Sequence, residues 1–394
     1  GGYHTCALSN SGKTYCWGDA GNGQLGDNQT TARLMPVLTL YGASAESPVT
    51  TLDGAGSFGG AASWNFYNLK FGDGVGATTS TATGAGDIII ENVLTTSTNQ
   101  TLSASSKTYT LLGSATPFVN GGVFTASTSL VNYAGSTANV TAAVFNDLTL
   151  GGTGTYTMPA TTITLRGNLM ITTGSTVTKG AGTVVFSKGG GATQTWTDNA
   201  ASKQDLGTVQ VSANAGNTTL NLVSSVKLTN LILDSAQTLS ANGANTMTVT
   251  GNWTNNGGTF GPSTGTVEFS GSGTQTLAGS SAFYNFQATT AAARTINFTA
   301  GSTQSVLTGG SATFTGASGQ NLTLASTAPG TAWNFQADNN ISAQTIAYVS
   351  VSDSNAGPFG TYTEMIASDG TSTDGGNNLN WNFGKTSEGF LTYF

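Results

Sequence analysis

This chain of 394 residues has few charged side chains, and the residues that usually carry enzyme chemistry are scarce. Charged residues make up 7% of the sequence, against about 25% in an average globular domain. There are one histidine and two cysteines, and the 11 basic residues are outnumbered by 18 acidic ones. Nucleic-acid binding relies on clustered lysine and arginine. No basic stripe is present, so we expect no nucleic-acid partner.

Long apolar runs, helical periodicity and proline are also nearly absent. No apolar segment approaches the ~18 residues of a membrane-spanning helix, so we expect no membrane span. With seven prolines and 37% hydrophobic residues, the composition is not that of a disordered chain. Threonine, serine, asparagine and 55 glycines take the place of the missing charges. A charge-poor Thr/Asn-rich chain of this kind favours an extracellular or cell-surface location.

Short alternating runs fill most of the sequence. In TLNLVSSVKLTNLILD (219–234), Leu220, Leu222, Val226 and Leu228 alternate with polar residues. Further runs of this kind lie at 162–174, 246–253 and 266–277. Period-2 strands of four to six residues between Gly, Asn and Ser turns predict an all-β fold.

The runs recur. The segment GTVVFSKGGGATQTW (182–196) resembles GTVEFSGSGTQTL (265–277). A shorter element occurs four times, as FYNLKF (66–71), FNDLTL (145–150), FYNFQA (283–288) and WNFQAD (333–338). Triplets of strands roughly 18 to 25 residues apart fit the three-stranded rung of a parallel β-solenoid, or β-helix. We expect about 14 rungs and a rod on the order of 70 Å long. The alternative is a string of β-sandwiches.

Three segments differ in character. We predict a small β unit at 1–50, a solenoid body at 51–340, and a β cap with a tail strand at 341–394. Asp353, Asp369 and Asp374 lie in turns of the last segment, where they either shape turns or bind calcium through their oxygens. The aromatic residues are expected to fill the solenoid interior, among them Trp64, Phe66, Phe145, Trp253, Phe283, Tyr284 and Trp333.

The first 40 residues carry an ordered pattern of specific residues. It comprises Gly2, His4, Cys6-Ala7-Leu8, Gly12-Lys13, Tyr15-Cys16-Trp17-Gly18, Gly23-Gln24-Leu25-Gly26-Asp27 and Pro36-Val37. This segment resembles one blade of the β-propeller family typified by the regulator of chromosome condensation. The resemblance implies two adjacent antiparallel strands with Cys6 opposite Cys16, hence a disulfide, and a core position for His4. The alternative to the disulfide is a pair of free thiols, since the two cysteines and one histidine leave a metal site short of ligands. A single blade cannot close a ring, so the ring's partner functions do not carry over.

The rest of the chain is similar to Thr/Gly-rich bacterial cell-surface repeat proteins and filamentous adhesins. The similarity is carried by GNW-x-N-N-G-G-TF, GTVEFSGSGTQTL, FYNF and SDGTSTDGGNNLNW. Parallel β-helices also host polysaccharide-active enzymes, whose sites use clustered carboxylates. Here the acids are scattered, as Asp147, Asp198, Asp205, Asp234 and Glu268 show. We therefore expect no catalytic residues, although acids from different rungs can still meet in space.

These observations predict a secreted microbial structural protein with no cofactor other than an optional calcium ion. We expect it to self-assemble head to tail into a filament, sheath or surface stalk, with another copy of itself as partner. The expected docking residues are Tyr3, Trp17, Leu25, Phe390, Leu391, Tyr393 and Phe394. The alternatives are a host- or glycan-binding adhesin that does not polymerise and a polysaccharide-active enzyme.

Overall fold

A computed structural model describes residues 4–8, 14–20, 25, 31–38 and 49–384. The chain divides into two compact units, residues 1–49 and 50–394. The described residues form strands and turns without a helix, so none of them belongs to a helix long and apolar enough to cross a membrane.

The first unit contains a three-stranded antiparallel sheet in the order β1 (His4–Leu8), β2 (Thr14–Gly18) and β3 (Arg33–Leu38). Its buried hydrophobic cluster among the described residues consists of Cys16, Ala20 and Leu25.

The second unit is built almost wholly from parallel sheets. The largest has twelve strands: β4 (Val49–Leu52), β6 (Trp64–Phe71), β8 (Ile88–Thr96), β10 (Thr108–Leu111), β11 (Phe118–Asn120), β13 (Leu130–Tyr133), β16 (Asp147–Leu150), β19 (Leu169–Ile171), β22 (Thr193–Asp198), β24 (Thr219–Leu222), β27 (Thr238–Ser240) and β30 (Thr259–Gly261). The next has eleven: β15 (Val144–Phe145), β18 (Ile163–Leu165), β21 (Thr183–Phe186), β23 (Thr208–Val211), β26 (Asn230–Leu233), β29 (Trp253–Asn255), β32 (Gln275–Ala278), β34 (Arg294–Phe298), β36 (Leu322–Ser326), β39 (Val349–Val351) and β42 (Thr373–Asp374).

Four smaller sheets complete the unit. One has eight strands: β25 (Val226–Leu228), β28 (Thr246–Val249), β31 (Thr266–Phe269), β33 (Ser281–Thr289), β35 (Thr303–Thr315), β37 (Trp333–Ala337), β38 (Ala343–Ala347) and β40 (Ser354–Asn355). The others are β5 (Gly56–Phe58), β7 (Thr78–Ala82), β9 (Gln100–Ser103) and β12 (Val123–Thr125); β14 (Thr137–Asn139), β17 (Thr155–Thr157) and β20 (Thr176–Thr178); and β41 (Met365–Ile366) with β43 (Trp381–Asn382).

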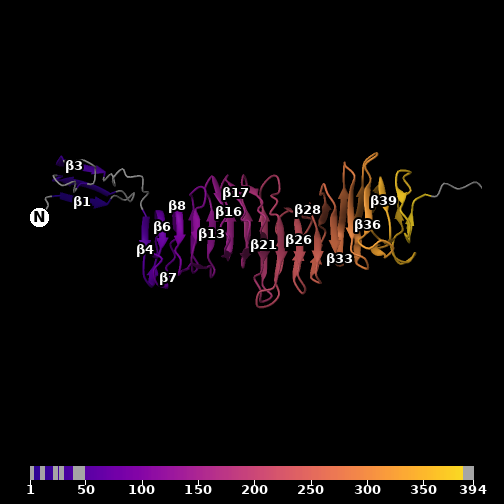
Figure 1. The fold of residues 1–394 in the computed structure, drawn as a ribbon, viewed down its shortest axis with the longest axis horizontal. Coiled ribbons are helices and arrows are strands. Elements are labelled where there is room, and N and C mark those ends of the chain that lie inside the picture. The colour runs from indigo at the N-terminus through magenta and orange to yellow at the C-terminus, as the bar shows by residue number, and fades with distance from the viewer. Residues whose placement is uncertain (1–3, 9–13, 21–24, 26–30, 39–48, 385–394) are drawn as a thin grey trace, which may run out of the picture. The chain divides into compact units, whose positions relative to one another are not determined.

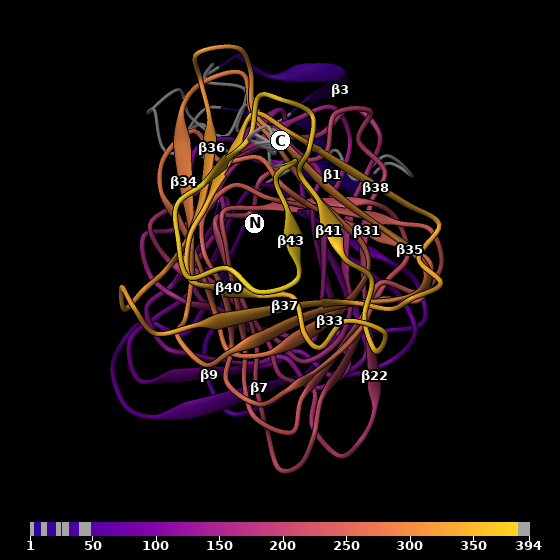
Figure 2. The ribbon, with the colours of Figure 1, turned by 90° about the vertical axis from the view of Figure 1, so that its right-hand side faces the viewer.

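The connections between these sheets make a parallel β-solenoid of about 15 turns. In one turn the chain runs through β27, β28 and β29, one strand on each of three faces, and then reaches β30, which pairs in parallel with β27. The strands of residues 50–384 stack side by side along one axis in Figure 1, and the end view of Figure 2 shows the chain winding around that axis. The prediction of a parallel solenoid is confirmed.

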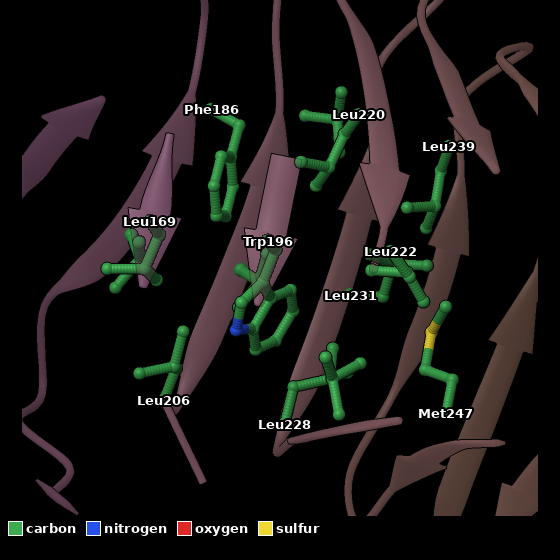
Figure 3. Packing of buried hydrophobic residues seen from close by; sticks show 14 of the residues in the cluster. Leu169, Phe186, Trp196, Leu206, Leu220, Leu222, Leu228, Leu231, Leu239 and Met247 are labelled. Carbon is green, nitrogen blue, oxygen red and sulfur yellow. The ribbon is translucent and has the colours of Figure 1, made fainter. Parts of the chain in front are cut away.

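Alternation along each strand separates the core from the surface. β24, β26, β28 and β31 all follow the pattern of half-exposed and buried residues in turn. Leu220, Leu222, Leu228 and Leu231 are buried and point into the same interior as Trp196 (Figure 3). Because parallel pairing repeats at every turn, inward side chains stack on their equivalents in the turns above and below.

The interior aromatics follow the prediction for most of the residues named. Phe145, Trp253, Phe283 and Trp333 are fully buried, and the ring of Trp333 stacks on Phe298 with centroids 3.7 Å apart. Trp64 and Phe66 are partly buried against the core. For Tyr284 the prediction is wrong, since its side chain is half-exposed on the outer surface.

The repeated GTV-x-F-S…TQT segments share one hydrogen-bond arrangement. The buried Gln194 donates from Nε2 to the carbonyl oxygens of Leu165 (2.9 Å) and Gly167 (2.6 Å), and its Oε1 accepts from the backbone N–H of Lys188 (2.9 Å). Gln275 repeats the arrangement with Val249 (3.1 Å), Gly251 (2.6 Å) and Gly271 (3.3 Å).

The two segments nevertheless occupy different faces. β21 lies in the eleven-stranded sheet, whereas its sequence counterpart β31 lies in the eight-stranded one. The repeat is therefore a strand–corner–strand unit and not a whole number of turns. This explains why its spacing in the sequence differs from the length of a turn.

Corners use a second shared arrangement. Asn168 accepts at Oδ1 from the backbone N–H of Thr195 in the next turn (2.9 Å), and Asn252 accepts in the same way from Thr276 (2.9 Å). These two corners precede strands of different sheets, β19 and β29. The same hydrogen bond, from a backbone N–H to an asparagine side chain, thus forms at corners in different positions around the turn.

The region expected as a separate cap continues the solenoid. β38, β39 and β40 pair in parallel with β35, β36 and β37 of the preceding turn. Residues 341–384 belong to the same compact unit as the body. A cap formed by the end of the chain stays a prediction, because residues 385–394 lie outside the described part.

Candidate interaction surfaces

The predicted cysteine pair lies on neighbouring strands. β1 and β2 pair antiparallel with Cys6 opposite Cys16, which is the register that a cross-strand disulfide needs. Cys16 is 3% exposed. The side chain of Cys6 is outside the described residues, so the disulfide stays a prediction.

The predicted docking residues divide into three groups. Tyr3, Phe390, Leu391, Tyr393 and Phe394 lie outside the described residues. Leu25 is fully buried in a cluster with Cys16. Trp17 is half-buried, so among the described residues of this set it has accessible surface. The core position expected for His4 is wrong, because its side chain is exposed.

The three aspartates considered for calcium have hydrogen-bond partners within the chain, Asp353 in the neighbouring coils and the other two in their own turns. Asp353 accepts from the backbone N–H of Gly330 (3.1 Å) and from the Asn377 side chain (3.0 Å). Asp369 and Asp374 accept backbone N–H groups two or three residues further on, at 3.1 and 2.9 Å. Among the described residues no group of three or more acidic, histidine or cysteine side chains could hold a metal ion. The turn-forming interpretation accounts for the contacts of Asp369 and Asp374, whereas Asp353 joins neighbouring coils.

The acids of the solenoid body also have local structural partners. The Asp205 carboxylate pairs with Lys179 at 2.7 Å, and Asp234 accepts from the Gln210 amide at 2.8 Å. Asp198 is buried and accepts from two backbone N–H groups of its own loop, those of Ala200 and Gln204. Burial raises the pKa of Asp198, although these bonds and the nearby Lys203 act to lower it.

The remaining two acids bind neighbouring turns. Asp147 accepts from the backbone N–H of Asn168 at 2.5 Å, and Glu268 accepts from the Thr248 hydroxyl at 3.0 Å. Each contact joins one turn to the next, so these carboxylates hold the stack together.

An apolar groove lies in the last described turns of the solenoid. We call it the terminal groove. It encloses about 380 Å³ and is lined by Asn355, Gly357, Pro358, Phe359, Leu379 and Asn380. Phe359 is 84% exposed and Leu379 is 63% exposed. These two side chains give the groove apolar surface that is open to solvent.

Sequence patterns did not single out these two residues. Phe359 stands in Gly-Pro-Phe-Gly, outside any alternating run, and Leu379 follows a pair of asparagines. A large apolar residue between turn-forming residues is the signal that could have identified Phe359, since such a residue has no strand to bury it.

Searches among curated proteins and among solved structures found no match to this chain. Residues 1–24 match the Regulator of chromosome condensation (RCC1) repeat family.

Proposed function

We propose that this chain is a secreted microbial structural protein that assembles head to tail into an extracellular filament, sheath or stalk. The observation that carries the proposal is the terminal groove. A stack of parallel turns ends in strand edges and apolar side chains, and these need a cover. Phe359 and Leu379 supply the apolar part of such a contact.

In the proposal, the first unit provides the surface that covers this end of the solenoid. Its three-stranded sheet belongs to a compact unit of its own, and a sheet of this size gains stability when a further surface packs on it. In the proposal, residues 1–49 of one copy cover the terminal groove of the next. A contact between two different surfaces that does not close into a ring propagates as a filament.

The surface of the solenoid suits close packing of many copies. Only 7% of the residues are charged, and the net charge of −7 is spread over 394 residues. Repulsion between neighbouring copies is therefore weak. Outward positions carry mainly threonine, serine and asparagine, whose hydroxyl and amide groups hydrogen-bond across a contact without ionic cost.

Deletion of residues 1–49 tests the proposal, because residues 50–394 form a compact unit of their own. We expect the full chain to form regular polymers in negative-stain electron microscopy. The shortened chain should give isolated rods with an unchanged far-ultraviolet circular dichroism spectrum. Polymers of normal length from the shortened chain would refute the proposed contact, and isolated rods from the full chain would favour the adhesin alternative.

A point variant tests the terminal groove itself. Burial of Phe359 contributes about 2 kcal/mol, so Phe359→Ser should raise the concentration required for polymer formation about 30-fold. Val75 is 77% exposed and lies far from this end in the sequence, so Val75→Ser is the matched control and should polymerise like the unchanged chain. Equal effects of both substitutions in sedimentation assays would remove the groove from the contact.

A further inference from the structure

A second groove lies at a corner of the solenoid and adjoins the terminal groove, since its residue Tyr362 donates from its backbone N–H to the Pro358 carbonyl oxygen at 3.3 Å. We call it the corner groove. It encloses about 310 Å³, which is within the range of small-molecule sites, and its lining includes Tyr284, Leu307, Thr308, Gln336, Asp338 and Tyr362. These residues come from four successive turns. The groove therefore depends on the stacking of the solenoid and not on one local loop.

The groove forms because consecutive corners grow longer. In β33 a single residue, Tyr284, separates the two halves of the strand at a register shift. In the next turn the four residues 307–310 take its place, and in the turn after that the five residues 338–342 do so. The longer corners project beyond the shorter one and form a wall beside the Tyr284 ring.

Two glycines allow this wall to approach the tyrosine closely. A Cβ atom at Gly310 would lie 1.9 Å from the Tyr284 carbonyl oxygen, and one at Gly309 would lie 3.1 Å from the Tyr284 hydroxyl. Gly309 also has a φ of +77°, which favours glycine. Its N–H donates to the Asn340 carbonyl oxygen at 2.9 Å and so ties one projecting corner to the next.

The polar side of the groove is fixed by hydrogen bonds. Asp338 Oδ1 accepts from the backbone N–H of Asn340 at 2.8 Å, and the backbone of Asp338 donates to Val306 at 2.9 Å. The Asn340 backbone and the Thr308 hydroxyl lower the pKa of Asp338, so the group is a carboxylate at neutral pH. A carboxylate has about four acceptor positions, which leaves capacity for ligand hydroxyls.

The lining thus pairs apolar surfaces with a small number of fixed polar groups. Tyr284 and Tyr362 are both half-exposed, and Leu307 is 40% exposed. Gln336 and Asp338 stand beside them with an amide and a carboxylate. A pyranose ring has the matching chemistry, because one face presents C–H groups and its rim presents hydroxyls. No basic residue lines the groove, so nothing there would neutralise an acidic sugar.

We propose that the corner groove binds a neutral pyranose unit of a polysaccharide, which stacks on Tyr284 and hydrogen-bonds through its hydroxyls to Asp338 and Gln336. The corner groove and the terminal groove share no lining residue, although they adjoin at Tyr362. The corner groove would let a structural rod attach to a glycan matrix.

Affinity electrophoresis of the full chain in gels that contain dextran, laminarin, xyloglucan or galactomannan tests the proposal. We expect at least one of these neutral polysaccharides to retard the protein. Tyr284→Ala should weaken that binding at least about tenfold, since it removes the stacking surface, and Asp338→Asn should weaken it by a similar factor. Tyr284→Phe keeps the ring and should retain most of the affinity.

Tyr67 provides the matched control. It occupies the same position in FYN of β6, also at a register shift, and is 42% exposed, but only two residues of the next turn stand opposite it. Tyr67→Ala should therefore bind like the unchanged protein. The proposal is overturned if no neutral polysaccharide binds, if only acidic pectin or cationic chitosan binds, or if both tyrosine variants behave alike.

Discussion

The hydrogen bonds of Gln194 should stabilise one corner of the solenoid locally, and Gln194→Met measures how much. Methionine has nearly the same volume, so the substitution removes the amide without opening a cavity. Of the three partners, the Leu165 carbonyl oxygen also accepts from the Ser187 N–H at 2.9 Å and stays paired. The Gly167 carbonyl oxygen and the Lys188 N–H lose the bond to Gln194.

The expected magnitude follows from these two groups. A buried polar group that loses its partner costs about 1–3 kcal/mol. The exposed side of the corner at Lys188 is open to water, which moderates the cost there. We expect a loss of about 2–4 kcal/mol in the local free energy of opening, equivalent to a fall of roughly 30- to 900-fold in amide protection.

Hydrogen–deuterium exchange with mass spectrometry on the full chain is the appropriate assay. Turns of a solenoid interact mainly with their neighbours, so one global unfolding energy would not report this change. Peptides that cover 183–198 should lose protection, and peptides around 265–278 should not. Gln287 is a half-exposed glutamine of β33, so Gln287→Met should change local opening by less than about 0.5 kcal/mol. Unchanged protection in Gln194→Met, or an equal effect of Gln287→Met, would refute the reasoning.

Three further substitutions test the core, a corner and a buried acid. Trp253→Ala removes a fully buried ring whose centroid lies 5.0 Å from that of Phe260. The substitution should lower local stability by about 3–5 kcal/mol and speed proteolysis within these turns, and an unchanged proteolysis rate would contradict this prediction. Gly251→Ala places a Cβ atom 2.4 Å from the Asn230 Oδ1. Hydrogen exchange at that corner should rise by an amount equivalent to about 1–3 kcal/mol, and unchanged exchange would show that the corner can accommodate the methyl group. Because burial raises the pKa of Asp198 in the folded state, protonation favours folding. Local opening there should become rarer as the pH falls through the raised pKa, and Asp198→Asn should abolish this dependence in exchange measurements.

Alternation in the sequence was sufficient to predict the fold class and most of the core. Leu220, Leu222, Val226 and Leu228 were predicted to alternate with polar residues, and all four are buried. The strands here have three and four residues, against the four to six expected, because a corner at Thr229 separates β25 from β26. The signal was present in the spacing. Inward residues two apart belong to one strand, and the interval of three between Leu228 and Leu231 marks the corner.

The grooves could not be predicted in this way. Tyr284 and Phe283 are adjacent, and alternation alone does not tell which corner residue projects outward. Whether Tyr284 lies in a groove depends on the lengths of the next two corners, which belong to residues 307–310 and 338–342. Those segments become its neighbours only through the parallel register between turns, which no local pattern contains.

The same contrast explains why the chain looks irregular in sequence and regular in structure. The faces require only alternation, so threonine, serine or asparagine can occupy an outward position without changing the stack. The corners require specific groups, such as Gln194 and Asn168, because backbone N–H and C=O groups that leave the ladder need a partner. A corner can nevertheless lengthen, as at 307–310, while the strands on both sides keep their register. Each lengthened corner then changes the surface without disturbing the core. We therefore expect binding surfaces on this solenoid to occur where adjacent corners differ in length.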